Sequence, residues 1–398
     1  MSSTPGTWRP TRNGRRWTLV APFPSGGTLH TEGPGTLDVV IAGGGPAACA
    51  AALTLRRYTG LSVILVERSG YDGDKVGETL SPGVLPLLDY LGVGEAFRAA
   101  NFSPSYAFTA AWGDDQLRAR DFLFTGRGYG WHLDRRRFDA GLASAARAFG
   151  AQLLLKARLQ QVIREEDGWS LTVSLEDAEV PLRCGYLIDA TGRSAWLARA
   201  LGAKKQRHDH LVGMATYHDA ASATVEACSL VESVPMGWWY SAPVPDGRVV
   251  SVLMTDSDLL QECHASRTAF WQAALDRAPH TRARIGQLEA LEPLRVWPAH
   301  SQSLEPGSGE GWAAAGDAAA AFDPLSSMGI GYALSTGIEA ARLAAAHFTD
   351  RADEQALRRT YGDDIRRHVD EYLTLKRGYY GAEGRFAQEP FWARRQVG

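Results

Sequence analysis

A glycine-rich turn between two short apolar runs constrains this chain more than any other feature. The run 37–41 is rich in β-branched residues, which is typical of a buried parallel strand, and residues 47–58 have the pattern of a helix. Gly43, Gly45 and Ala48 match the dinucleotide fingerprint G-x-G-x-x-G/A. Its first glycine makes the tight turn, its second lets the backbone approach a pyrophosphate, and its third position packs helix against strand. The sequence therefore predicts a diphosphate at a helix N-terminus.

A second apolar run, 63–66, ends in an acidic residue at the spacing that this fingerprint requires. Glu67 follows the run directly, and Arg68 comes next. A carboxylate about 20 residues beyond the glycines commonly binds the ribose hydroxyls. We therefore predict Glu67 and Arg68 at a nucleotide site. The alternative is a glycine-rich loop that only turns the chain.

Composition and charge exclude several classes of protein. The 398 residues are 45% hydrophobic, which is enough for two or three domains with ordinary cores. The net charge of -3 offers no broad basic face, so we expect no nucleic-acid partner. The four cysteines form no C-x-x-C pair, so no disulfide framework and no metal site are expected, and the cytoplasm is the expected compartment. No run of 18 apolar residues occurs, so no membrane span is expected.

Residues 1–36 form an N-terminal extension rich in Thr, Pro and Gly. Arg15 and Arg16 suggest a twin-arginine signal, but the apolar stretch 17–24 is too short and is interrupted by proline. We expect a peripheral tail or a short covering strand.

Polar and cationic residues precede two of the expected helices. Glu78 and Thr79 come just before an expected helix at 83–91, where they either contact a ligand or cap the helix start. Arg135 opens a helix at 135–149 together with two further arginines. Three cations oppose the helix dipole at this end. Either one of them pairs with an anion such as a phosphate, or all three are solvated.

The aromatic segment 237–243 lies within a β-rich region and contains Trp238, Trp239 and Tyr240. It reads as a strand before a Pro-Asp-Gly turn, and such clusters form either core or the wall of a site. Further along, Asp317 follows an expected strand and can bind a ribityl hydroxyl, while a helix beginning near Met328 can aim its N–H groups at a flavin carbonyl. The residues expected along this second segment are Pro324, Ser327, Met328, Gly329 and Ile330.

We expect an α/β protein, α+β overall, in which a β-rich domain is inserted into a Rossmann-like nucleotide domain. Its expected divisions are an extension at 1–36, a discontinuous nucleotide domain at 37–105, 130–205 and 301–347, a β-rich substrate domain at 106–129 and 206–300, and a helical C-terminal cover at 348–398.

Together the glycine motif, Glu67, the Asp189-Ala190-Thr191-Gly192 strand end and Gly316-Asp317 resemble the FAD-binding architecture of single-component flavoprotein monooxygenases, the glutathione-reductase and p-hydroxybenzoate-hydroxylase type. Four further segments, 76–79, 131–134, 237–243 and 324–329, resemble flavin-dependent tryptophan halogenases. The resemblance implies FAD between the two domains, O2 as cosubstrate, and NAD(P)H or a separate flavin reductase as electron source.

Two departures from the halogenase pattern change the expected reaction. No lysine occurs between Lys75 and Lys156, where halogenases carry their active-site lysine, and Ser326 replaces the glutamate of P-L-E-S-T-G. Without that lysine the chain resembles the halogenase-like monooxygenases, including flavoproteins that hydroxylate tryptophan during tryptophylquinone formation. The resemblance implies hydroxylation of an electron-rich ring through a flavin C4a-hydroperoxide, with Trp238 and Tyr240 beside the ring.

The expected substrate is an indole of a precursor protein, a peptide or a natural product. The alternatives are a halogenase, a flavin reductase or dehydrogenase like the prenyl reductases, and a flavin-binding maturation partner without catalysis. Oxygen uptake with reduced FAD would distinguish the monooxygenase from a maturation partner without catalysis.

Overall fold

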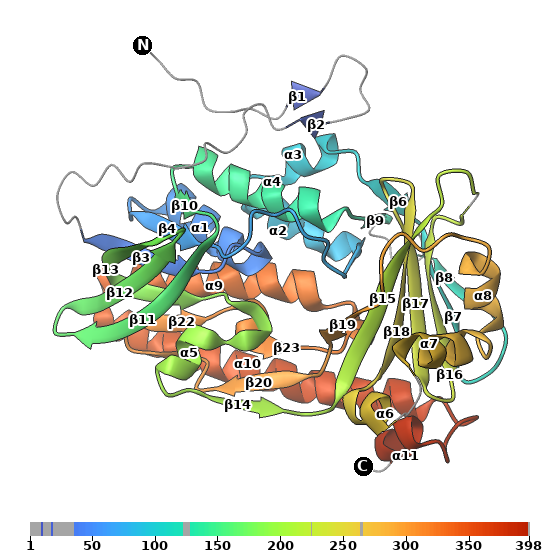
Figure 1. Cartoon of the computed structure of the whole chain (residues 1–398). Helices are drawn as coiled ribbons and strands as arrows, with labels where there is room; N and C mark the ends of the chain where they lie inside the picture. The colour runs from blue at the N-terminus through green and yellow to red at the C-terminus, as the bar shows by residue number, and fades with distance from the viewer. Residues whose placement is uncertain are drawn as a thin grey trace.

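The computed structural model describes residues 9–10, 17–18, 36–121, 128–223, 225–262 and 266–396. Two large sheets lie at opposite ends of the molecule in Figure 1, and the long helix α10 (Arg351–Gly381) extends beneath both. Of the extension, only the antiparallel pair β1 (Arg9–Pro10) and β2 (Trp17–Thr18) is described. The arginine pair at 15–16 lies outside the described residues.

The first large sheet has a parallel core around β3 (Leu37–Ala42). This strand pairs in parallel with β4 (Val63–Val66) on one side and with the end of β13 (Ala178–Asp189) on the other. At the edges, β10 (Gln152–Leu154) joins β4, and β22 (Trp312–Ala314) joins β13, both in parallel. The β-branched residues of β3 and β4 are buried, as expected of strands covered on both faces.

An antiparallel hairpin extends this sheet. In it, β11 (Ala157–Glu165) pairs with β12 (Gly168–Leu175), which pairs with the first half of β13. The short strand β21 (Ser308–Gly309) pairs with β22. Because β13 is long, it belongs to both the parallel core and the hairpin, and so connects the two.

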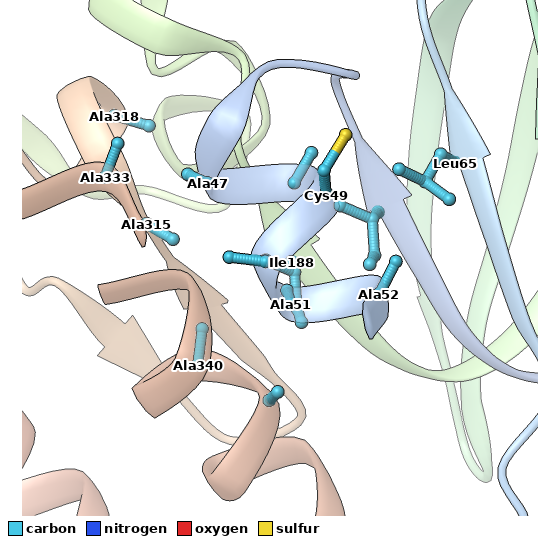
Figure 2. Close-up of a cluster of buried hydrophobic side chains, with 14 of the residues drawn as sticks. Ala47, Cys49, Ala51, Ala52, Leu65, Ile188, Ala315, Ala318, Ala333 and Ala340 are labelled. Atoms are coloured by element: carbon cyan, nitrogen blue, oxygen red, sulfur yellow. The ribbon is translucent and has the colours of Figure 1, made fainter. Parts of the chain in front are cut away.

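The helix α1 (Pro46–Tyr58) packs closely on α9 (Gly329–Thr349) because small side chains line both surfaces. Figure 2 shows Ala47 of α1 beside Ala318 and Ala333. A Cβ atom on Gly337 of α9 would lie 2.3 Å from the carbonyl oxygen of Ala47. Only glycine therefore permits this approach, and it fixes the start of α1 relative to α9.

The second large sheet contains the aromatic strand. Its order is β19 (Arg295–Pro298), β15 (Leu211–Asp219), β18 (Arg248–Asp256), β17 (Gly237–Val244), β16 (Cys228–Val234), β7 (Ala107–Ala111) and β8 (Arg118–Asp121). One face is covered by α7 (Arg267–Leu275) and α8 (Pro279–Ile285), against which Trp239 packs. The other face carries Trp238 and meets the end of α10 and α11 (Pro390–Gln396).

Two small sheets and several short helices complete the described chain. The small sheets order as β5 (Thr79–Leu80), β9 (Gly130–His132), β6 (Ser103–Ser105), and as β14 (Lys204–Arg207), β20 (Gln302–Glu305), β23 (Ala320–Ala321). The remaining helices are α2 (Leu85–Tyr90), α3 (Gly94–Ala99), α4 (Arg135–Ala148), α5 (Trp196–Ala200) and α6 (Ser257–Glu262), with 3-10 turns at Pro82–Val84, Gly192–Ser194, Gly316–Ala318 and Pro324–Ser326. Within the described ranges, no helix has the length and apolar character needed to cross a membrane, and no cluster of three metal-binding side chains is found.

Replacing Gly337 with alanine tests the close packing of α1 on α9. We expect Gly337→Ala to reduce the free energy of unfolding by about 1–3 kcal/mol, because the added methyl group meets backbone. The matched control is Gly378→Ala in α10, where a Cβ meets nothing within 4 Å and alanine favours the helix. Urea unfolding measures the free energy of unfolding of both variants. An equal loss in Gly337→Ala and Gly378→Ala would contradict the packing argument.

A buried ion pair joins α10 to the second sheet. Lys376 of α10 donates to the carboxylate of Asp209, which also accepts the backbone N–H groups of Leu211 and Ser301. Burial by itself would raise the pKa of Asp209, but the Lys376 ammonium and these donors lower it to about 2.

This pair makes stability depend on pH in acid. Because the native pKa of Asp209 is depressed, its contribution is present above the ordinary pKa of aspartate and is lost as the pH falls from about 4 to about 2. Asp209→Asn should therefore reduce the free energy of unfolding by about 2 kcal/mol at pH 7 and by about half as much at pH 3. Urea titrations at both pH values measure this, and a difference independent of pH would refute it.

Candidate active site

A cavity of about 400 Å³ lies where the glycine turn, the start of α9 and one face of the second sheet meet. Of the predicted site residues, those that line it are Gly45, Thr79, Arg135, Trp238, Tyr240, Asp317, Pro324, Ser327, Met328, Gly329 and Ile330. These residues are distant in sequence, and the fold brings them together.

The glycine turn presents bare backbone to this cavity. Gly43 has φ +117°, and a Cβ there would lie 2.3 Å from the carbonyl oxygen of Ala190. A Cβ on Gly45 would meet nothing within 4 Å, because this residue faces open space in the cavity. Ala48 is fully buried in α1. The turn thus needs Gly43 for its shape and Gly45 for access.

Two helices begin at the cavity with free N–H groups. Neither α1 nor α9 has a side-chain cap or an acidic residue in its first turn. Their positive ends converge on the space between Gly45 and Gly329. This is a favourable place for an anion at one helix and for an electron-rich oxygen at the other.

Glu67 and Arg68 lie behind the turn. Glu67 is buried and accepts from the backbone N–H and the hydroxyl of Ser69. A Cβ on Gly44 would come within 2.8 Å of the Glu67 side chain, so the carboxylate lies close to the turn. Arg68 is exposed. Their contact with a nucleotide stays a prediction.

Arg135 is paired inside the protein. Its guanidinium contacts the buried carboxylate of Asp139 at 3.2 Å, and Lys75 contacts the same carboxylate at 2.9 Å. Burial raises the pKa of Asp139, but the two cations outweigh it and lower the pKa below its ordinary value. The side chain of Asp134 caps α4 by accepting from the N–H groups of Arg136 and Arg137. Arg135 is therefore not simply solvated, because Asp139 holds its charge at the cavity wall.

Glu78 and Thr79 do not cap a helix, because Thr79 begins β5 and the next helical turn starts at Pro82 without a side-chain cap. Glu78 is buried, and it accepts from the N–H of Gly77 and from the hydroxyl of Tyr217. Burial raises the pKa of Glu78. The carboxyl group of Glu78 thus connects the segment before β5 to Tyr217 of the second sheet, and it does not line the cavity.

The aromatic strand divides its side chains between two faces, as the two-residue period of a strand requires. Trp238 and Tyr240 line the cavity, whereas Trp239 packs edge-on against Trp271 on the far face at 4.4 Å between ring centroids. The hydroxyl of Tyr240 forms a hydrogen bond with Thr79 Oγ1 at 2.8 Å. Trp238 and Tyr240 therefore form an aromatic wall of the cavity, and the hydrogen bond to Thr79 fixes the Tyr240 hydroxyl.

Several cavity residues were not predicted from the sequence, among them Arg193, the partner of Asp317. Asp317 pairs with Arg193 at 3.3 Å, and Arg193 also donates to the carbonyl oxygens of His300 and Phe322. Other lining residues that the sequence did not single out are Lys75, Phe108, Asp139, Val231, Met254 and Asp323. The pattern of a strand end followed by Thr-Gly-Arg could have pointed to Arg193, but the others depend on tertiary contacts.

Residues 36–375 match the family described as the FAD binding domain. The chain belongs to this FAD-binding family. The oxidoreductase LodB of Marinomonas mediterranea is 30% identical over 363 residues, covering 90% of this chain and 97% of LodB. LodB is described as FAD-dependent.

Two solved structures extend the comparison. The flavin-dependent halogenase CmlS has a TM-score of 0.84 and 25% identity, over 92% of this chain and 68% of CmlS. The peptidyl tryptophan dihydroxylase QhpG, described as essential for tryptophylquinone cofactor biogenesis, has a TM-score of 0.73 and 26% identity, over 91% of this chain and 79% of QhpG. The FAD-binding fold is thus shared with both halogenases and hydroxylases.

The cavity fits the cofactor of this family. The bare backbone at Gly45 and the free N-terminus of α1 suit a pyrophosphate, and the free N-terminus of α9 suits a flavin carbonyl. The Asp317 carboxylate, whose side chain is 34% exposed, is an acceptor for ribityl hydroxyls. FAD supplies the redox chemistry when it is bound, and these groups of the chain would bind and orient it.

Gly45→Val tests the cofactor site. The valine side chain would project into the open space at Gly45, so we expect a folded protein that has lost bound FAD. Gly60→Val is the control, because a Cβ there also meets nothing within 4 Å but Gly60 does not line the cavity. The 450 nm flavin absorbance per protein measures occupancy after gel filtration. A full flavin complement in Gly45→Val would contradict the assignment.

Proposed function

We propose that this chain is an FAD-dependent monooxygenase that hydroxylates an electron-rich aromatic ring, most specifically an indole held by a protein or peptide. One atom of O2 is inserted into a ring C–H bond and the other leaves as water. NAD(P)H supplies two electrons and one proton as a hydride, directly or through a flavin reductase, and the second proton comes from solvent. The observation that carries this proposal is the aromatic wall: Trp238 and Tyr240 face the same cavity as the flavin-binding segment 324–330.

The side chains of Ser326 and Lys75 favour oxygen insertion over halogenation. Ser326, in place of the halogenase glutamate, donates its hydroxyl to the carbonyl oxygen of Asp323 at 2.8 Å. Lys75 lines the cavity, but Asp139 binds its ammonium group. Neither side chain offers a free amine or carboxylate for handling a halogen. The likeness to QhpG supports an indole substrate.

The chain's own contribution to the reaction is to position the ring and keep water away. Phe108, Val231, Trp238 and Met254 form an apolar surface on the inner face of the second sheet. An aromatic substrate stacked there would gain about 0.5–1.5 kcal/mol for each ring pair beyond its buried area. A ring held at a fixed distance and orientation relative to the flavin reacts faster, because the translational and rotational entropy is lost on binding and not in the reaction step.

The experiment uses the holoprotein, 18O2 and an electron supply of NAD(P)H with a flavin reductase. The probes are free tryptophan, a tryptophan-containing peptide and the protein encoded beside this gene, each analysed by mass spectrometry with and without bromide. We expect a gain of one or more 18O atoms and no bromine. A brominated product, or a desaturated or reduced carbon skeleton without added oxygen, would overturn the proposal.

A pair of neighbouring variants tests the aromatic wall. Trp238→Leu removes the ring from the cavity, so we expect FAD to stay bound, product to fall about tenfold or more and hydrogen peroxide to rise, because an ill-placed ring leaves activated oxygen unused. Trp239→Leu makes the same change on the opposite face of the strand and should leave the ratio of product to peroxide unchanged. Equal uncoupling in both variants would contradict a direct role for Trp238.

A further inference from the structure

Three side chains on one face of α10 form hydrogen bonds with residues outside this helix. Tyr372, Lys376 and Tyr380 are spaced by four residues and so lie along one side of the helix. Tyr372 and Tyr380 are buried, and each of the three forms a hydrogen bond with a residue of another element. This region was expected only to be a helical cover, but its two tyrosine hydroxyls connect to residues that line the cavity.

The Tyr380 hydroxyl joins two residues of the cavity wall. The indole N–H of Trp238 donates to the Tyr380 oxygen at 2.9 Å, and the Tyr380 hydroxyl donates to Asp323 Oδ2 at 2.6 Å. All three residues are about 1% exposed, so water does not compete for these bonds. The single donor of the Trp238 side chain is used in this chain of hydrogen bonds.

The two ends of these linked hydrogen bonds belong to different segments of the chain that line the cavity. Trp238 lies in β17 on the second sheet, whereas Asp323 directly precedes Pro324 and the segment that leads into α9. Asp323 is fixed at two further points: its Oδ1 accepts the N–H of Leu325 at 3.0 Å, and its own N–H donates to the Tyr372 hydroxyl at 2.9 Å. A movement of Tyr380 would therefore free the Trp238 ring from the flavin-binding segment.

We propose that Tyr380 is a positioning residue that holds the Trp238 indole in one orientation relative to the segment 324–330, and so sets the place of an aromatic substrate in the cavity. The part of this proposal that concerns a substrate rests on the proposed function. The link between Tyr380, Trp238 and Asp323 stands on the geometry alone.

The aromatic surroundings of Tyr380 support positioning by the hydroxyl rather than by the ring. Its ring packs among Trp112, Phe391 and Trp392, with centroids 5.8–6.1 Å away. Phenylalanine would keep these contacts and lose only the two hydrogen bonds. The change from tyrosine to phenylalanine at this residue therefore isolates the link.

The experiment compares Tyr380→Phe with Tyr372→Phe in the FAD-loaded protein. Both lose a hydroxyl that contacts Asp323, but only Tyr380 contacts Trp238. Proteins labelled with 15N at the tryptophan indoles give the exchange rate of the Trp238 N–H, assigned with a Trp238→Phe sample. We expect exchange to accelerate about tenfold or more in Tyr380→Phe and to change less than about twofold in Tyr372→Phe.

A second readout measures binding of the probe N-acetyl-tryptophanamide to the same proteins. We expect the Kd to rise about fivefold to tenfold in Tyr380→Phe and to stay near wild type in Tyr372→Phe. In the Trp238→Phe background, Tyr380→Phe should have no further effect, because the donor is already absent.

The outcomes separate this proposal from the proposed function. Unchanged N–H exchange in Tyr380→Phe would overturn the link, and equal loss of probe affinity in both tyrosine variants would show that Tyr380 only supports the fold. A third outcome is that exchange accelerates in Tyr380→Phe while the wild-type protein binds no probe and adds no oxygen to any substrate. This outcome would refute the proposed function and leave the link intact.

Discussion

The structure depends on how closely α1 approaches α9. Gly337 allows the backbone of α1 to lie against α9 at a distance that even one methyl group would prevent. Because both helices begin at the cavity, this contact also sets the spacing between their positive ends. One glycine in the middle of a helix thus controls the geometry at the two helix N-termini that we expect to face the phosphates and the carbonyl oxygens of a flavin dinucleotide.

The nucleotide half of the site was predictable because its chemistry depends on backbone. Gly43, Gly45 and the strand before them form a local pattern in which sequence distance and spatial distance nearly coincide. Asp317 and the segment 324–330 were also predicted as site residues, since each directly follows a strand or precedes a helix, and they line the cavity. Their contact with a cofactor stays a prediction. These features can be recognised in the sequence because few residue types adopt a positive φ angle or occur at the first position of a helix.

The other half of the site was less accessible to sequence reasoning. The period of a strand separates Trp238 from Trp239, but it does not say which of them faces a ligand. The pairing of Arg135 with Asp139 has helical spacing, yet the additional contact with Lys75 needed the tertiary structure. Tyr380 is 57 residues from Asp323 and 142 from Trp238, and nothing local to α10 indicates that its hydroxyl connects them.

The long helix α10 has a consequence for the order in which this site is made. Every residue that lines the cavity is translated before Tyr372 and Tyr380, which secure Asp323 and Trp238 from behind. During synthesis the parallel sheet, the second sheet and their shared cavity can begin to form while these two hydroxyls are still absent. If the proposed function holds, a nascent chain released before α10 is complete would hold most of the predicted cofactor-binding groups with a loose aromatic wall, a combination suited to consuming oxygen without a product. In this order of synthesis, α10 supplies the last two hydroxyl groups that secure Asp323 and Trp238.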